Sequence, residues 1–148
     1  MLLPYNLGTV HVDLEQAILS RNTAQIQALL TLINREIGID ALPPYIPYLM
    51  IAVESNNIEI LRLLLEAGFK IDTIDDDGWS ALMFAVLENN IAMVRVLVEA
   101  GADVNIESPT GEFALEIALD NDYAQLIDYL YPLTNLKLKQ NLDIRDRF

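Results

Sequence analysis

The chain has 148 residues, 53% of them hydrophobic, a length and composition typical of one folded domain rather than a disordered segment. It contains no cysteine and a single histidine, which excludes disulfides, a thiol nucleophile, a zinc ribbon and any site that needs two imidazoles. Nine Lys and Arg against 22 Asp and Glu give a net charge of −13, which repels nucleic acid and anionic membranes and attracts basic proteins.

The first elements expected along the chain are two helices and an irregular connection. Asp13 and Gln16 have the spacing of a capping box, so we expect the first helix to begin there. A longer helix is expected over Thr23–Glu36, and the non-standard connection INREIGIDALPPYIP covers residues 33–47. No basic start precedes an apolar run, and no apolar stretch approaches the ~18 residues of a membrane span. We therefore expect a soluble, cytoplasmic protein.

From residue 48 onward the sequence repeats itself with a period of 33 residues. A gap-free alignment joins YLMIAVESNNIEILRLLLEAGFKID (48–72) to ALMFAVLENNIAMVRVLVEAGADVN (81–105), and the same shift leads to ALEIALDNDYAQLIDYLY (114–131). A weaker copy precedes them at a shift of 35 residues, so the chain contains four consecutive units. Such a period is typical of proteins whose units stack because none can bury its apolar face alone.

Each unit carries the signals of two short helices and a turn, most clearly in the third unit. Ser80 is an N-cap residue before an apolar helical stripe, and Asn89-Asn90 separates this helix from the next one. Gly101 is expected in the left-handed conformation that closes the second helix. The extended stretch DVNIESPTG (103–111) contains Pro and Gly as turn residues and leads into the fourth unit.

These units resemble ankyrin repeats, most closely in DDDGWSALMFAVLENNIAMVRVLVEAGADVN (75–105) and LLLEAGFKID (63–72). The resemblance covers about residues 14–131 and implies an all-α fold, an ankyrin-repeat solenoid of stacked helix-turn-helix pairs with hairpin-like fingers. It implies an ankyrin repeat domain over residues 1–132, with residues 133–148 as a C-terminal cap or tail that is either a short docked helix or a loose segment. The implied repeats lie at about 10–42, 43–75, 76–108 and 109–132.

The family's Thr-Pro-Leu-His motif is altered in every unit of this chain. No copy retains the histidine, and Met50 and Met83 are expected to pack at that position instead. The small residues Ala52, Ala85 and Ala118 recur at one position of the first helices, where they allow the paired helices to approach closely.

Two patterns of acidic residues suggest other chemistry. In the run DTIDDDG (72–78), Gly78 fits the turn of an EF-hand loop, but Thr73 and Phe84 would replace its first and last ligands. We therefore predict an exposed hairpin tip and no metal. Glu112 and Glu116 lie four residues apart, but acid–base catalysis needs a buried carboxyl in a closed cleft, and the resemblance implies an open groove. We predict neither an enzyme nor a cofactor.

The resemblance also implies which residues contact a partner, because the family uses its finger tips and the exposed ends of its first helices. Seven of the implied residues are acidic and none is basic. Trp79 is interpreted either as an exposed interface anchor or as a side chain that folds onto Ile46, whereas Phe84 is expected in the core. The implied partner-binding residues are Ile46, Glu54, Asp76, Asp77, Trp79, Leu87, Glu88, Glu107, Glu112 and Asp120.

The function implied by the resemblance is non-catalytic recognition of another protein. The acidic contact positions indicate that the partner has a basic surface, and the net charge indicates a monomer that binds neither nucleic acid nor membrane. Two roles remain open, a general adaptor and a dedicated inhibitor such as an immunity protein that neutralises a basic toxin or nuclease. Self-association and a fragment of a longer array are weaker alternatives.

Overall fold

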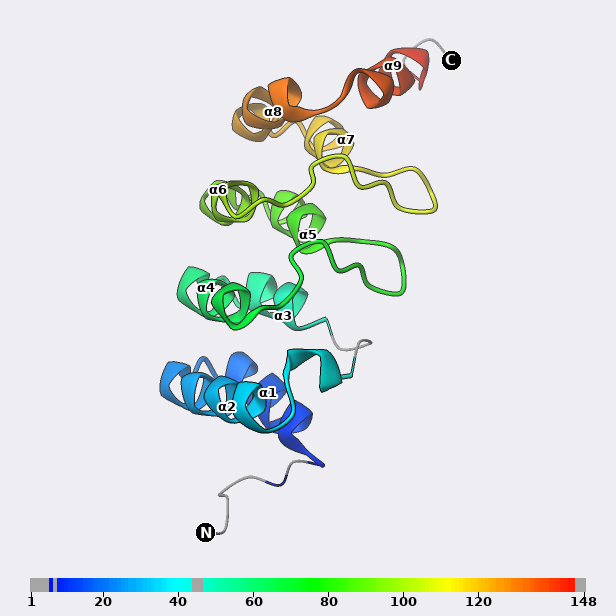
Figure 1. Ribbon diagram of the computed structural model, residues 1–148. Helices are drawn as coiled ribbons and strands as arrows, with labels where there is room; N and C mark the ends of the chain where they lie inside the picture. Colours follow the sequence, from blue (N-terminus) through cyan, green and yellow to red (C-terminus); the bar gives the residue numbers. More distant parts are fainter. Residues whose placement is uncertain (1–5, 7, 44–46, 146–148) are drawn as a thin grey trace. The chain divides into compact units, whose positions relative to one another are not determined.

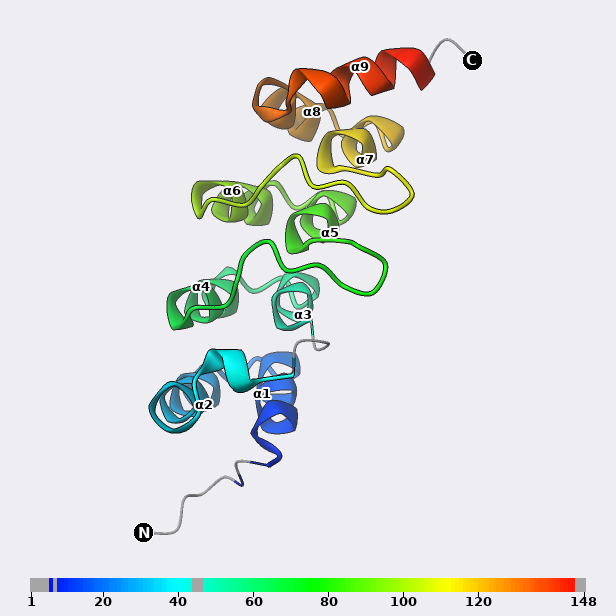
Figure 2. The ribbon, with the colours of Figure 1, turned by 45° about the vertical axis from the view of Figure 1, so that its right-hand side comes forward.

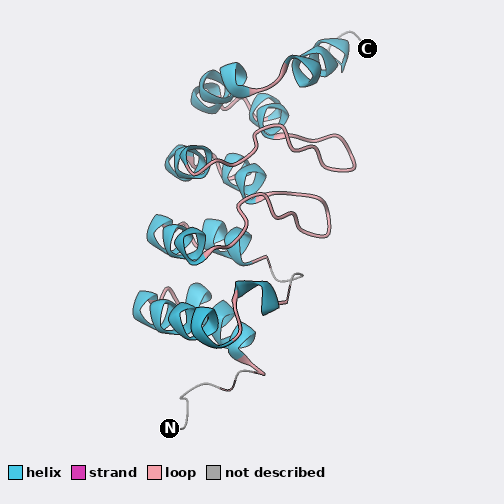
Figure 3. Cartoon of the chain, in the orientation of Figure 1, coloured by secondary structure: helices cyan, strands magenta, loops and turns pink. Residues whose placement is uncertain are grey.

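The described residues form helices and connecting loops. The computed structural model describes residue 6, residues 8–43 and residues 47–145, and this part of the chain contains no strand, only a single antiparallel bridge between Ile74 and Ser80 (Figures 1 and 3). The chain divides into two compact units, residues 1–71 and 72–148.

The first unit contains two helical pairs. Helix α1 packs against α2 and α3, and α4 packs against α3 and α2, so the two pairs form two layers (Figure 2). Leu14 and Ile18 from α1 and Ile26 and Leu29 from α2 are buried at the centre of the unit. The elements are α1 (Val10–Leu19), α2 (Thr23–Glu36), the 3-10 turn η1 (Ile39–Ala41), α3 (Tyr48–Glu54) and α4 (Ile58–Ala67).

The start of α1 differs from the capping-box prediction. The helix begins at Val10, and the residue before it, Thr9, makes no side-chain capping bond. Val10 is buried, so extending the helix back by one turn places another apolar side chain in the core. Asp13 therefore lies within the first turn, where its negative charge is favourable, but it is not the cap. The capping-box prediction was wrong.

The second unit also contains two helical pairs, followed by a C-terminal helix. Helix α5 packs against α6 and α7, and α7 packs against α8. Its elements are α5 (Ala81–Leu87), α6 (Ile91–Glu99), α7 (Ala114–Asp120), α8 (Ala124–Leu130), the 3-10 turn η2 (Tyr131–Leu133) and α9 (Leu136–Arg145). The segment interpreted as a cap or tail thus includes a helix, and its Leu138 is buried.

The helix boundaries of the third repeat follow the local signals in its sequence. The hydroxyl of Ser80 accepts a hydrogen bond from the N–H of Met83, and the side chain of Asn90 accepts one from Met93. Asn89 has φ 51° and Gly101 has φ 99°, so both lie in the left-handed region. The predictions for Ser80, the Asn89-Asn90 break and Gly101 are confirmed.

The altered motif positions also lie where the sequence predicts. Met50 and Met83 are buried, and so are the small residues Ala52, Ala85 and Ala118. The fourth repeat carries Glu116 at the position of the two methionines, and this side chain is only 6% exposed. The carboxyl of Glu116 is therefore a structural group of the stack rather than a group facing solvent.

Candidate protein-interaction surface

Two long loops project from the second unit on the side away from α6 and α8. We name residues 72–80 the first finger and residues 105–113 the second finger, and both views show them side by side (Figures 1 and 2). Each finger leads directly into the first helix of a repeat, α5 or α7. The repeats therefore present two similar loops to one side of the unit.

The two fingers share one pattern of hydrogen bonds at positions 33 residues apart. In the first finger the N–H of Asp75 donates to the carbonyl of Trp79, and in the second the N–H of Ser108 donates to the carbonyl of Glu112, both at 2.9 Å. The side chain of the first residue of each turn accepts a second hydrogen bond. Asp75 Oδ1 accepts from the N–H of Trp79, and Ser108 Oγ accepts from the N–H of Glu112. Each finger is therefore an ordered hairpin-like turn.

Glu112 forms the centre of a polar network in the second finger. Its Oε2 accepts hydrogen bonds from Thr110 Oγ1 at 2.6 Å and from Ser108 Oγ at 2.9 Å. These hydroxyl donors, Thr110 first, lower the pKa of Glu112 below its ordinary value, with a smaller contribution from Trp79 and against the effect of burial. The carboxylate is thus a hydrogen-bond acceptor that holds the finger, not a raised-pKa acid suited to catalysis.

Direct contacts join the two fingers to each other. Trp79 Nε1 donates a hydrogen bond to Glu112 Oε2 at 3.3 Å. Gly78, with φ 79°, lies so close to the second finger that a Cβ atom there would come 2.5 Å from Pro109 Cδ. At the base, Asp72 Oδ1 accepts from the N–H of Asp103 at 2.8 Å. The fingers are therefore held as a pair.

An aromatic pair lies where the first finger meets α5. The rings of Trp79 and Phe84 have centroids 5.5 Å apart and are tilted by 57°. Both side chains are half-buried, so part of each ring faces solvent. The expectation that Phe84 belongs to the core was wrong, because this residue covers the indole rather than filling the interior. Trp79 is partly structural, through Phe84 and Glu112, and leaves an aromatic surface exposed.

The remaining implied contact residues lie at finger tips and helix ends. Asp76, Asp77 and Glu107 are exposed on the fingers. Exposed residues at the C-terminal ends of α5 and α7 are Leu87, Glu88 and Asp120. Glu54 is exposed at the end of α3 in the first unit, whereas Ile46 lies outside the described residues.

The charge of the two fingers is entirely negative. Together they carry six carboxylates and no Lys or Arg. Asp72, Asp75 and Glu112 use side-chain oxygens to accept hydrogen bonds inside the unit. Asp76, Asp77 and Glu107 are exposed to solvent on the same two fingers.

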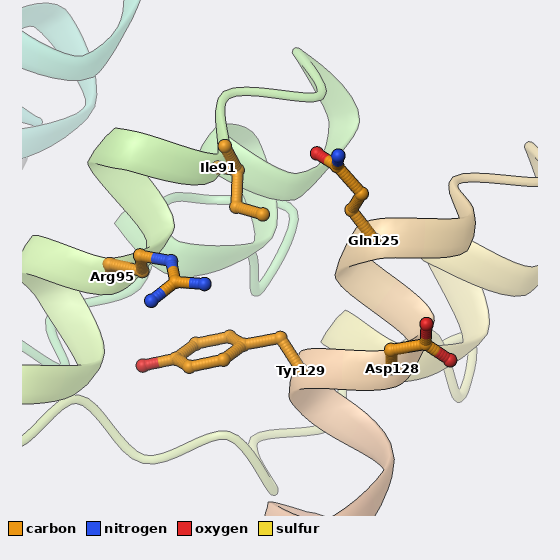
Figure 4. Close-up of a pocket in the computed structure, with 5 residues that line it drawn as sticks. All are labelled: Ile91, Arg95, Gln125, Asp128 and Tyr129. Atoms are coloured by element: carbon orange, nitrogen blue, oxygen red, sulfur yellow. The ribbon is translucent and has the colours of Figure 1, made fainter.

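A groove lies between α6 and α8. It has a volume of about 550 Å³ and is lined by Ile91, Arg95, Gln125, Asp128 and Tyr129 (Figure 4). The guanidinium carbon of Arg95 lies 5.0 Å from the centroid of the Tyr129 ring, and Asp128 points away from this pair.

Two further observations concern the described part of the chain. None of its His, Asp and Glu side chains form a group of three that is able to hold a metal ion. No helix within it combines the length and apolar character needed to cross a lipid bilayer.

Stacked helix pairs with finger loops define a helical repeat protein. The family model for ankyrin repeats, three copies, matches residues 14–108 and 49–141. The chain therefore belongs to the ankyrin repeat family, whose repeats form solenoids and in general act as non-catalytic modules for protein–protein interaction. Among curated proteins, no sequence matches the chain significantly.

Proposed function

We propose that this chain is a monomeric, cytoplasmic, non-catalytic protein that binds a basic surface of another protein. The binding residues are those of the two fingers together with the ends of α5 and α7. One observation carries the proposal: Asp76, Asp77 and Glu107 are exposed on the two fingers, the first finger also carries the half-buried Trp79, and neither finger contains a Lys or Arg. The same charge disfavours nucleic acid and anionic membranes as ligands.

The two kinds of side chain have different roles in this proposal. Exposed carboxylates at the rim of an interface mainly raise the association rate of a basic partner and make that rate sensitive to salt. The aromatic pair supplies apolar area, and tryptophan is among the residues that most often dominate binding energy. Because Trp79 is held by Phe84 and Glu112, its ring is ordered before the partner arrives.

The test is affinity capture with mass spectrometry, run in parallel on the wild type and on Asp76→Lys with Asp77→Lys. A matched control, Glu99→Lys with Asp128→Lys, changes the charge equally on exposed positions of α6 and α8. We expect the finger variant to lose the partner and the control to keep it. Surface plasmon resonance with the purified partner should then show slower association and a weaker salt dependence for the finger variant alone.

Equal loss of binding in both variants would show that net charge, not the fingers, attracts the partner. Unchanged binding in both would place the interface elsewhere. An assay of the captured partner then separates the two roles, because an inhibitor abolishes its partner's activity and an adaptor leaves it intact.

A further inference from the structure

The C-terminal end of the second unit presents a cluster of exposed apolar side chains. Tyr131 is 52% exposed, Leu133 43% and Leu136 69%, and all three lie between the end of α8 and the first turn of α9. The other large exposed apolar residues described in this unit, Ile74 and Leu87, stand singly. Isolated exposed apolar residues are normal, whereas three of them within residues 131–136 favour a contact surface.

Hydrogen bonds hold this segment to the base of the second finger and to the end of α8. The N–H of Asn135 donates to Asn105 Oδ1 at 2.8 Å, and Asn135 Oδ1 accepts from the N–H of Leu138 at 2.9 Å. The hydroxyl of the buried Thr134 bonds the carbonyl of Leu130, and Leu138 is itself buried. The three apolar side chains therefore project from an ordered backbone, so little backbone entropy is lost on binding.

The charge of this end is opposite to that of the rest of the chain. Residues 131–142 contain Lys137, Lys139 and no carboxylate, whereas residues 1–130 contain five Lys and Arg against twenty Asp and Glu. Lys139 Nζ lies 4.4 Å from the centroid of the Tyr131 ring, which keeps the ammonium beside the apolar cluster. We name Tyr131, Leu133, Leu136, Lys137 and Lys139 the C-terminal surface.

We propose that the C-terminal surface binds an acidic segment of a partner protein that carries leucine or aromatic side chains between its carboxylates. The apolar residues of such a segment cover Tyr131, Leu133 and Leu136, and its carboxylates pair with Lys137 and Lys139. Charge complementarity selects this occupant, because Lys137 and Lys139 are the only charged residues within 131–142. A short acidic segment can contact these two lysines without approaching the acidic remainder of the unit. A broad anionic lipid surface meets the repulsion of the whole unit.

This inference goes beyond the proposed function because it concerns another surface and a ligand of opposite charge. A chain with an acidic finger surface and a basic C-terminal surface joins two unlike partners, as an adaptor does.

The experiment measures fluorescence anisotropy of a labelled peptide, Glu-Glu-Leu-Leu-Glu-Glu-Phe-Leu-Glu-Glu, titrated with the full chain. One control peptide has Lys in place of Glu, and another has Ser in place of Leu and Phe. The protein variants are Lys137→Glu with Lys139→Glu, and Leu133→Ser with Leu136→Ser. The matched charge control is Arg62→Glu with Arg95→Glu, since both arginines are exposed on other helices.

We expect saturable binding of the acidic apolar peptide and none of either control peptide. Each C-terminal variant should weaken binding about tenfold or more, and the arginine control by less than about threefold. Of the two C-terminal variants, only the leucine variant should keep the salt dependence of peptide binding that the wild type shows. Circular dichroism establishes that all variants are folded, which is expected because every substituted apolar side chain is exposed.

Three results would overturn the proposal. The first is no saturable binding of the acidic apolar peptide by the wild type. The second is an equal loss in the arginine control. The third is binding of vesicles of phosphatidylserine and phosphatidylcholine that depends on Lys137 and Lys139 while the peptide stays unbound. None of these results bears on the fingers, whose test uses a basic partner and different variants.

Discussion

Trp79 Nε1 donates its hydrogen bond to Glu112, the residue that occupies the same position one repeat later. Equivalent positions of adjacent fingers therefore lie next to each other, and one carries the donor while the other carries the acceptor. If both equivalent positions carried tryptophan, or both carried glutamate, this hydrogen bond could not form. The pair thus links the fingers of the third and fourth repeats directly.

The hydrogen bonds to Glu112 should make stability depend on pH. Because its pKa is lowered in the folded state, the stabilisation is fully present above the unfolded value, near 4.3, and is lost as pH falls through the folded pKa. Glu112→Gln should therefore be less stable than the wild type at pH 7, with the gap closing on acidification. Urea unfolding at pH values from 7 to 3 measures this difference in the free energy of unfolding. Glu107→Gln, on the same finger, is the control and should differ little from the wild type.

Gly78→Ala should separate backbone strain from contact between the fingers. A side chain at φ 79° is strained, and its Cβ would also overlap Pro109 Cδ, so we expect a loss of roughly 2–4 kcal/mol in the free energy of unfolding. Gly101→Ala, with a similar φ and open space around it, should lose about 1 kcal/mol. Combining Gly78→Ala with Pro109→Ala should recover part of the difference. Equal losses at both glycines would contradict the close approach.

Gly101→Val should destabilise the second unit by more than the ~1 kcal/mol of an average substitution, because a β-branched residue is strained at φ 99°. A Cβ atom at this position has no atom within 4 Å apart from its chain neighbours, so backbone strain should account for most of the loss. Ala100→Val is the control, since it adds a valine to the neighbouring exposed position at φ −80°. Thermal melts that do not distinguish Gly101→Val from the wild type would be inconsistent with a left-handed helix end.

Calcium should leave the melting temperature unchanged. In the first finger, Asp75 Oδ1 already accepts hydrogen bonds from the N–H groups of Asp77 and Trp79. The positions of the first and last ligands of an EF-hand loop hold Thr73 and Phe84. Differential scanning calorimetry with calcium and with magnesium tests this, and a rise of several degrees with calcium alone would show that the finger binds the ion.

Trp79→Ala should raise the dissociation rate of a finger-bound partner, at a loss of about 2 kcal/mol or more in binding free energy. Trp79→Phe retains an aromatic ring but removes the donor to Glu112, so it separates the ring from the hydrogen bond. Surface plasmon resonance measures both rates, and circular dichroism checks the fold. If Trp79→Ala changed only the association rate, the indole would not be the anchor of the interface.

The repeat period allowed most of the fold to be predicted, because local signals recur in each unit. Caps such as Ser80 and Asn90 act over three residues, and the left-handed Gly101 acts over one turn, so sequence alone locates them. The start of α1 was missed because the burial of Val10, a tertiary effect, outweighs a local capping pattern.

The site was less predictable, because it depends on which side chains meet across repeats. Trp79 and Glu112 were both identified as surface positions, yet their mutual hydrogen bond was not foreseen. The signal was present in the sequence, since a shift of 33 residues superposes the two. The partial exposure of Phe84 had no such signal, because an apolar residue on a short helix is predicted to be core until its packing partners are known.

Asp72 and Asn105, also one repeat apart, each hold a backbone N–H about thirty residues further along the chain, at Asp103 and Asn135. The base of each finger is thus hydrogen-bonded to a segment that follows it in the chain. The second of these bonds lies just before the start of α9. Fraying of α9 would break the hydrogen bond between Asn135 and Asn105 first, and the bond between Asp103 and Asp72 would remain. Amide hydrogen exchange should accordingly accelerate in the second finger before the first, with the order of opening running backwards along the chain.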